Sequence, residues 1–149
     1  MAVLLLYVDD ILLTGSCSTM LDNLILCLKK AFAMKELGEL GYFLGLEEVK
    51  NADSITLNQK KYTLELLDKA GMLDSKPCNT PVVKGVRLYV HDGTKLDNPI
   101  EYMIIVRALQ YLKDTMPDIC FGVNYVSQYM HSPTDMHFQF VKINLIYLK

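Results

Sequence analysis

The sequence predicts an α+β fold, with a small antiparallel sheet followed by a mainly helical half. Short apolar runs separated by turn residues fill residues 1–58, which is typical of strands and hairpins. From residue 59 onward, apolar residues recur at spacings of three and four, as they do on amphipathic helices. The chain therefore divides into a predicted sheet-bearing part, 1–58, and a predicted helical part, 59–149.

The first predicted element is a hairpin. Residues 3–8 and 11–14 are rich in Val, Leu and Ile, and they flank the adjacent acids Asp9 and Asp10. A helix is expected over residues 20–32, where the apolar residues Leu21, Leu24, Ile25, Leu28 and Phe32 share one face. A strand is then expected at 42–49, a hairpin loop at 51–54 and a returning strand at 55–57.

The second half begins with a predicted helix over residues 59–70, for which Gly71 is a natural C-terminal cap. Residues 74–99 carry Pro and Gly throughout and predict a long irregular connection. Three further helices are expected near 99–113, 117–130 and 133–149. Ser132 or Thr134 is the expected cap of the last one.

Composition limits the classes of function. The 149 residues are 51% hydrophobic, so the chain is expected to fold. The 15 basic and 17 acidic residues give a net charge of −2, and Arg87 and Arg107 are the arginines. Because nucleic-acid affinity comes largely from Lys and Arg, this balance argues against independent binding of nucleic acid.

Neither the cysteines nor the apolar runs indicate export or a membrane. Cys17, Cys27, Cys78 and Cys120 are scattered and are expected to be reduced, buried, small apolar residues. His131 and His137 have no cysteine or carboxylate set at ligand spacing, so no zinc site is predicted. No signal peptide, transit peptide or membrane span is recognised, and the compartment stays open.

Two adjacent carboxylates inside an apolar hairpin have two interpretations. Asp9 and Asp10 form either an acidic turn in solvent or a metal site, because buried charges need a partner. Carboxylates at a hairpin tip are the ligands that hold divalent ions in two-metal phosphoryl transfer. The residues alone leave both interpretations open.

The surrounding sequence blocks resemble the reverse transcriptases of copia-type retrotransposons over essentially the whole chain. The Tyr-Val-Asp-Asp hairpin at 7–10 is similar to their catalytic hairpin, and the later blocks occur in the same order and spacing. These blocks are 34–40, 42–47, 76–81, 108–112, 117–119 and 130–134. The chain is also similar to truncated plant remnants of such polyproteins, of the uncharacterised mitochondrial type.

The resemblance implies a role for several residues. Asp9 and Asp10 would be catalytic metal ligands for Mg²⁺ or Mn²⁺, with Tyr7 and Val8 near the primer terminus or the incoming nucleotide. A primer grip is implied at Tyr42, Phe43, Leu44 and Gly45. The implied partners in the intact ancestor are an RNA or DNA template-primer and deoxynucleoside triphosphates, and the implied location of the ancestor is a cytoplasmic particle.

Lys35 has two interpretations. By resemblance it is a candidate general acid for the leaving pyrophosphate. The alternative, which we favour, is an ordinary lysine at a helix C-terminus that complements the helix dipole.

The resemblance also implies a division into domains. Residues 1–58 would be a palm remnant with the catalytic hairpin and primer grip, and 59–149 a thumb and connection region. The family's third metal-binding Asp and its fingers lie well upstream of the hairpin, whereas Asp9 is near the start of this sequence. We therefore expect the chain alone to be inactive. The alternatives are a non-catalytic module that binds protein or nucleic acid, and a decayed, untranslated remnant.

Several positions in the helical part depart from the family. A basic residue, a serine and a small glycine of the family correspond to Met103, Ile104 and Arg107 here. A glycine that permits close helix packing is costly to replace with arginine. These changes indicate decay of the thumb region.

Overall fold

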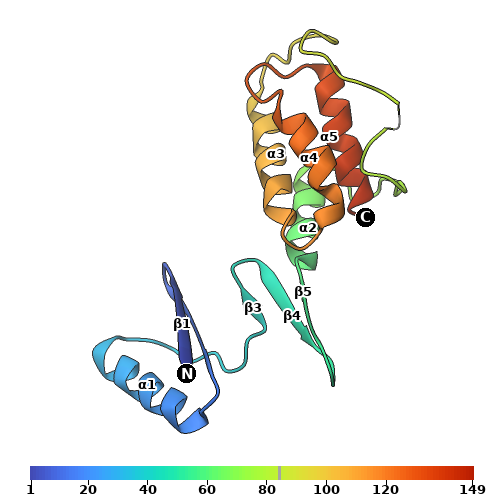
Figure 1. Cartoon of the computed structure of the whole chain (residues 1–149). Helices are drawn as coiled ribbons and strands as arrows, with labels where there is room; N and C mark the ends of the chain where they lie inside the picture. Colours follow the sequence, from blue (N-terminus) through green and yellow to red (C-terminus); the bar gives the residue numbers. More distant parts are fainter. Residues whose placement is uncertain (84) are drawn as a thin grey trace. The chain divides into compact units, whose positions relative to one another are not determined.

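The structure is a computed structural model that describes residues 1–83 and 85–149. It confirms the α+β class, with α-helices and two antiparallel sheets of two and three strands (Figure 1). The chain forms two compact units, Met1–Asn58 and Gln59–Lys149.

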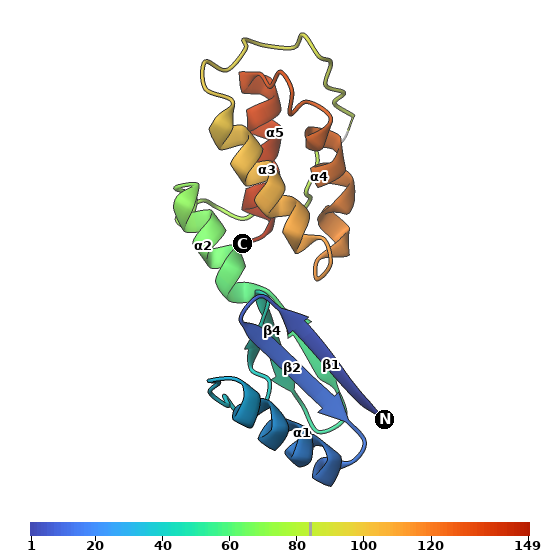
Figure 2. The ribbon, with the colours of Figure 1, turned by 90° about the vertical axis from the view of Figure 1, so that its left-hand side faces the viewer.

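The first unit opens with the predicted hairpin. Strands β1 (Ala2–Tyr7) and β2 (Asp10–Gly15) pair antiparallel, with Tyr7 opposite Asp10 at the closed end. Helix α1 (Ser18–Ala31) follows and packs against β2, as both ribbon views show (Figures 1 and 2). Lys29 and Lys30 occupy its last turn, where positive charge complements the helix dipole.

A three-stranded ribbon completes this unit, and it corrects the prediction of a single strand at 42–49. The strands are β3 (Tyr42–Phe43), β4 (Leu46–Lys50) and β5 (Ile55–Asn58). Leu44 and Gly45 form a two-residue turn between β3 and β4, with φ angles of 51° and 76°. The prediction failed because Leu occupies the first turn position, where Asn or Gly is the usual signal.

The described residues of the second unit form four α-helices and one 3₁₀ turn. These elements are α2 (Lys60–Lys69), α3 (Ile100–Leu112), the 3₁₀ helix η1 (Pro117–Ile119), α4 (Cys120–Ser127) and α5 (Asp135–Tyr147). Gly71 caps α2 as predicted, with a φ of 64° and its N–H donated to the Asp68 carbonyl. Thr134 caps α5, which settles the choice between Thr134 and Ser132.

The hydrophobic core lies in the second unit. Helices α3, α4 and α5 supply its fully buried centre, which includes Val106, Leu109, Val123, Val126, Val141 and Leu145. No residue of 1–58 is buried. Cys17 and Cys27 are exposed, so the expectation that they are buried was wrong: α1 covers one side of a thin hairpin and buries no residue completely.

The connection between α2 and α3 is irregular, as predicted. Its described residues form no helix or strand apart from an isolated bridge between Lys95 and Thr134. Part of it nevertheless packs on the helices, because Leu88 is buried in the core. Across the described residues, no helix is both long and apolar enough to cross a membrane.

Candidate active site

The candidate site is the closed end of the β1–β2 hairpin. Tyr7 pairs with Asp10, which leaves Val8 and Asp9 as a two-residue loop. Val8 has a φ of 49°, whereas Asp9 is not among the residues with positive φ. A positive φ at the first central residue alone is typical of a type II′ turn, a position that favours glycine.

This turn holds its first residue in a strained conformation. A β-branched side chain in the left-handed region costs about 1–3 kcal/mol unless the surrounding structure compensates. The Val8 side chain is also 78% exposed, so burial does not offset the strain. Pairing along the whole hairpin keeps the turn closed and presents the acids at its tip.

Both candidate metal ligands are open to solvent. Asp9 lies in the loop and Asp10 is the first residue of β2, and both are exposed. Mg²⁺ is usually held by one or two carboxylates together with water and substrate phosphates, so the pair fits part of a hard-cation site. Within 1–83 and 85–149, no group of three His, Cys, Asp or Glu side chains is placed to hold a metal.

The apolar body of the hairpin is largely uncovered. Leu4, Leu5 and Leu6 on β1 are exposed, and Leu6 reaches 66%. Residues Ile11, Leu12 and Leu13 of β2 are half-buried, on the strand against which α1 packs. Exposed apolar faces of this kind are typical of interaction surfaces, and an isolated two-stranded hairpin is marginally stable.

Lys35 does not lie in the last turn of a helix, so our preferred interpretation of it was wrong. Helix α1 ends at Ala31, and Lys35 is exposed in the connecting segment, residues 32–41. Helix α1 ends one residue before the end of the predicted helix, 20–32, and Lys35 lies beyond both ends. Within this irregular segment Gly38 takes a φ of 87°, a conformation that favours glycine.

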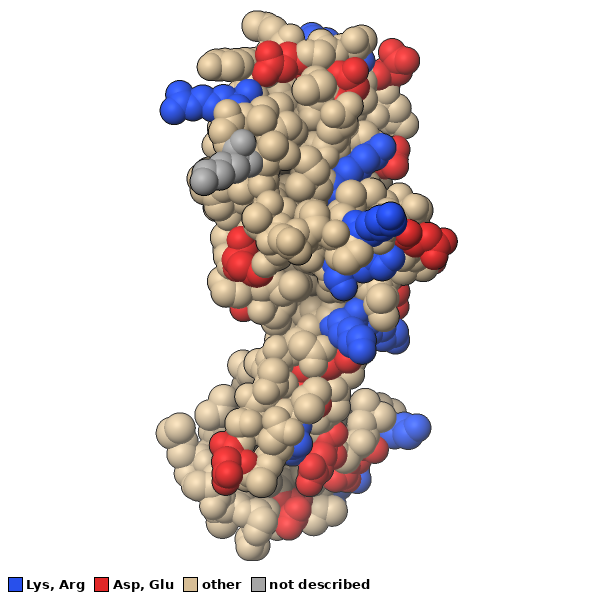
Figure 3. Space-filling model, turned by 90° about the vertical axis from the view of Figure 1, so that its right-hand side faces the viewer, with Lys and Arg blue, Asp and Glu red and all other residues tan. Residues whose placement is uncertain are grey.

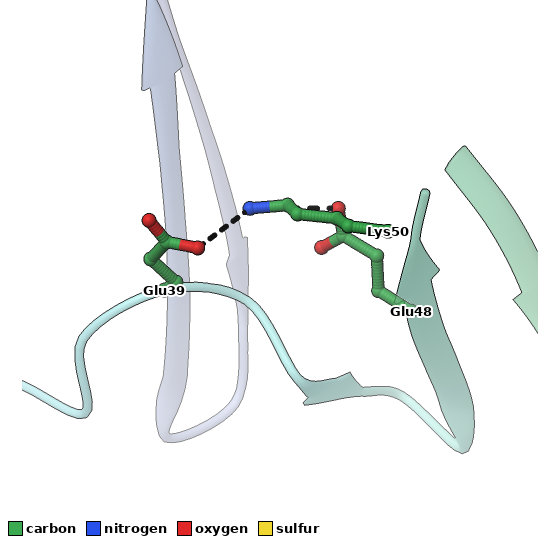
Figure 4. A network of polar contacts seen from close by, with 3 residues as sticks. All are labelled: Glu39, Glu48 and Lys50. Carbon is green, nitrogen blue, oxygen red and sulfur yellow. Dashed lines mark hydrogen bonds and ion pairs between the residues drawn. The ribbon is translucent and has the colours of Figure 1, made fainter. Parts of the chain in front are cut away.

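Ion pairs attach the connecting segment at both sides. Lys29 of α1 contacts Glu36 at 2.6 Å, and Lys50 of β4 contacts Glu39 at 2.9 Å. Lys50 also lies 3.8 Å from Glu48, whose side chain is only 5% exposed (Figure 4). The hydrogen bond and charge of Lys50 lower the pKa of Glu39, and Glu39 raises the pKa of Lys50. Sequence analysis missed this network, because no local spacing links Glu39 to Lys50.

The candidate primer-grip residues occupy a tight hairpin. Tyr42 and Phe43 form β3, while Leu44 and Gly45 form the turn. Positive φ at both central residues is typical of a type I′ turn, so Gly45 serves the turn and not close packing of a strand. The Tyr42 side chain is exposed and Phe43 is half-buried.

The charged surface is mixed. On the face drawn in Figure 3, basic and acidic side chains are interspersed. Arg107 is exposed on α3, so the expected packing cost of arginine at this position is absent.

The hairpin with paired acids, the following helix and the β-ribbon lie almost entirely within a region that matches a known family. Residues 2–84 match the reverse transcriptase (RNA-dependent DNA polymerase) family. The chain therefore belongs to the reverse transcriptase family.

The most similar relatives include transposon polyproteins. The chain is 46% identical over 145 residues to the retrovirus-related Pol polyprotein from transposon RE2 of Arabidopsis thaliana. That match covers 97% of this chain and 10% of the polyprotein. The corresponding polyprotein from transposon TNT 1-94 of Nicotiana tabacum is 32% identical over 157 residues, covering 99% of this chain and 12% of the polyprotein.

A shorter relative is similar over most of its own length. An uncharacterized mitochondrial protein of Arabidopsis thaliana is 47% identical over 146 residues, which covers 98% of this chain and 60% of that protein. No solved structure matches the chain. The chain thus corresponds to a retrotransposon reverse transcriptase segment that spans about a tenth of the polyproteins it matches.

Proposed function

We propose that the chain is the metal-holding hairpin, primer grip and thumb portion of a copia-type reverse transcriptase. The observation that carries the proposal is the pair Asp9–Asp10, exposed at the tip of a strained hairpin inside the region that matches the family. The ancestral reaction is DNA synthesis on an RNA or DNA template, by nucleotidyl transfer to a primer.

Each candidate residue has a proposed task. Asp9 and Asp10 hold Mg²⁺ or Mn²⁺, which activates the primer hydroxyl and stabilises the leaving pyrophosphate when bound. Tyr7 and Val8 flank the acids and contact the primer terminus or the nucleotide. Lys35 protonates the leaving group, and the β3–β4 hairpin at 42–45 supports the primer backbone.

We further propose that the 149-residue chain alone is inactive. Phosphoryl transfer depends on positioning and charge stabilisation, and two carboxylates without a cationic grip on the triphosphate provide little of either. The uncovered face of β1 indicates that the hairpin works against a further polypeptide. In the ancestral enzyme, the fingers and the rest of the palm would pack against this face of β1.

Primer extension tests this proposal. The chain is assayed with Mg²⁺ or Mn²⁺ on a primed RNA template, alone and with the preceding segment of a related polyprotein. We expect no product from the chain alone and measurable product from the mixture. Asp9→Asn is expected to reduce that product at least about a hundredfold, because removing one preorganised catalytic group costs 10²–10³ in rate.

Asp53→Asn is the matched control, since Asp53 is an exposed acid of another hairpin loop. It should leave extension by the mixture unchanged. Synthesis by the chain alone that is lost in Asp9→Asn would overturn the claim of inactivity. A mixture that associates but makes no product would overturn the enzyme proposal itself.

The exposed apolar strand favours a second candidate, a non-catalytic module that binds protein. Leu4, Leu5 and Leu6 provide the contact surface, and the acids have no part in it. This candidate predicts that the mixture associates without synthesis and that Asp9→Asn binds equally well. The same assay therefore distinguishes the two.

A further inference from the structure

Strand β1 has one free edge. The two-stranded sheet of the N-terminal unit consists of β1 and β2, so within the described part of the chain β1 is paired on one side only. The register with β2 runs without a bulge from Ala2 opposite Gly15 to Tyr7 opposite Asp10. A regular edge strand of this length presents a row of backbone donors and acceptors to another strand.

The alternation of the ladder shows which backbone groups point outward. The Ser16 N–H donates to the Met1 carbonyl at 3.2 Å, so Met1 directs its backbone groups toward the β2 side. In an antiparallel pair, alternate residues face the partner strand and the residues between them face away. The odd-numbered residues of β1 therefore bond to β2. The residues whose N–H and C=O groups point off the free edge are Ala2, Leu4 and Leu6.

The free edge of β1 lacks the features that usually keep strands apart. Charged side chains, proline and bulges are the common protection of an exposed edge. Residues 2–8 are uncharged and contain no proline. The side chains of Leu4 and Leu6 are 45% and 66% exposed, so apolar surface lies beside the outward backbone groups. The edge is therefore suited to pair with another uncharged strand.

The sequence of β1 is complementary to itself in the antiparallel direction. When Leu4 lies opposite Leu4 of the partner subunit, Leu6 lies opposite the partner's Ala2, and Val3 opposite the partner's Leu5. Each pair of outward-facing residues then exchanges both of its backbone hydrogen bonds. The paired side chains are all apolar, and a large leucine meets the small alanine at each end. A second copy of the chain thus satisfies the whole edge.

This arrangement also separates the acidic turns of the two copies. Asp9 follows Leu4 by five residues, and the antiparallel direction places the two turns at opposite ends of the sheet. At the usual rise of a strand the two Asp9 residues lie about 30 Å apart, several times the screening length of about 8 Å in physiological salt. A register centred on Leu5 would bring the acids closer and place Ala2 opposite the turn residue Val8. Charge and hydrogen bonding therefore both favour the register centred on Leu4.

We propose that two copies of the chain associate through β1, which joins their hairpins into one antiparallel sheet of four strands in the order β2–β1–β1–β2. The same edge is used on both copies, so the contact is symmetric and closes at two copies. The pairing needs the edge of β1 and not the acidic pair. It therefore stands or fails separately from the proposed catalytic function.

Analytical ultracentrifugation and amide exchange of the full chain, from micromolar to millimolar concentration, test the pairing. We expect a reversible monomer–dimer equilibrium. In the monomer, Leu4 and Leu6 should exchange faster than Val3 and Leu5, because their N–H groups have no partner strand. This alternation should fade as the dimer forms. A chain that stays monomeric, or that associates beyond the dimer, would overturn the proposal.

Charge variants at the centre of the interface test the register. Leu4→Lys or Leu4→Glu alone places like charges opposite each other and should raise the dimer dissociation constant at least about tenfold. A mixture of the two variants should associate at least about fivefold more tightly than either alone, because opposite charges then meet. Leu26→Lys is the matched control, since Leu26 is a 55% exposed leucine of α1, and it should leave the dissociation constant unchanged.

Two results with these variants would contradict the register. One is a dimer that persists unchanged in Leu4→Lys. The other is a mixture that associates no more tightly than its components. The concentration dependence of the wild-type chain decides the question even if a variant does not fold.

Discussion

Two turns of the N-terminal unit place bulky residues in the left-handed region of backbone space. Val8 and Leu44 have φ angles of 49° and 51°, and each occupies the first central position of a two-residue hairpin loop. Glycine adopts this conformation without a steric penalty. The strain at Val8 lies directly beside Asp9. The turn at the candidate site therefore contains a valine in a backbone conformation that is unfavourable for β-branched residues.

Replacing Val8 with glycine should relieve this strain. We expect Val8→Gly to stabilise the hairpin by about 1 kcal/mol, after the greater flexibility of glycine in the unfolded chain is subtracted. Amide-exchange protection along β1 and β2 measures the effect. Leu44→Gly is the matched control, since it should stabilise the β3–β4 hairpin and leave β1–β2 unchanged. Lower protection in Val8→Gly would show that the valine side chain supports the turn.

At the scale of single residues, sequence predicts chemistry better than conformation. The acidic pair was predicted at the hairpin tip, and it lies there. The strain at Val8 could not be predicted, because β-branched residues normally favour strands. His137 was considered only as a metal ligand, whereas it forms a capping box with Thr134 at the start of α5 and lies 3.0 Å from the carbonyl of Tyr89, which is distant in sequence.

At the scale of elements, ion pairs help to hold the connecting segment 32–41. Exposed pairs join it to α1 and β4, including Glu39 with Lys50, and the Glu48 N–H also donates to the Gly41 carbonyl at 3.1 Å. Because these contacts position the segment that carries Lys35, they determine where a candidate general acid can lie.

Acid should loosen this segment. The folded pKa of Glu39 is lowered, so its stabilising contribution is present above the ordinary value of 4.5 and is lost as the pH falls through the lowered value. We expect the backbone order parameters of residues 36–41 to fall in that range, as measured by ¹⁵N relaxation. Glu39→Gln should show the loosened segment already at neutral pH. Unchanged order in acid would mean that contacts other than this pair hold the segment.

Periodicity predicted most elements but not all of their boundaries. The helices around 20–32 and 59–70 were predicted because their apolar residues repeat at helical spacing. The strand at 42–49 was wrong, since a turn built from Leu44 and Gly45 gives no strong local signal. The irregular connection was predicted from its Pro and Gly content, but its attachment to α4 and α5 depends on distant partners.

At the scale of the whole molecule, the two units differ in what stabilises them. The helical unit has a continuous core, whereas residues 1–58 contain no buried residue. Hydrophobic burial is the main stabilising contribution to folding, so the first unit has little independent stability.

Hydrogen exchange of the intact chain should show this difference. We expect amides of β1 and β2 to exchange at least about a hundredfold faster than those of α3 and α5. Segments with little burial open at a small free-energy cost, whereas core helices open at a cost that approaches the full free energy of unfolding. Adding the preceding polyprotein segment should slow exchange in β1 without changing α5. Equal protection of the hairpin and the core helices in the chain alone would contradict the inferred difference in stability between the two units.

The most direct test of the account is whether the acidic turn holds a divalent ion. Mn²⁺ is titrated into the ¹⁵N-labelled chain, and the broadening of each amide signal is recorded. We predict that broadening centres on residues 7–11, is abolished by Asp9→Asn and is unaffected by Asp53→Asn. Broadening elsewhere, or at the hairpin regardless of Asp9, would contradict the claim that Asp9 and Asp10 are the metal-holding part of a reverse transcriptase.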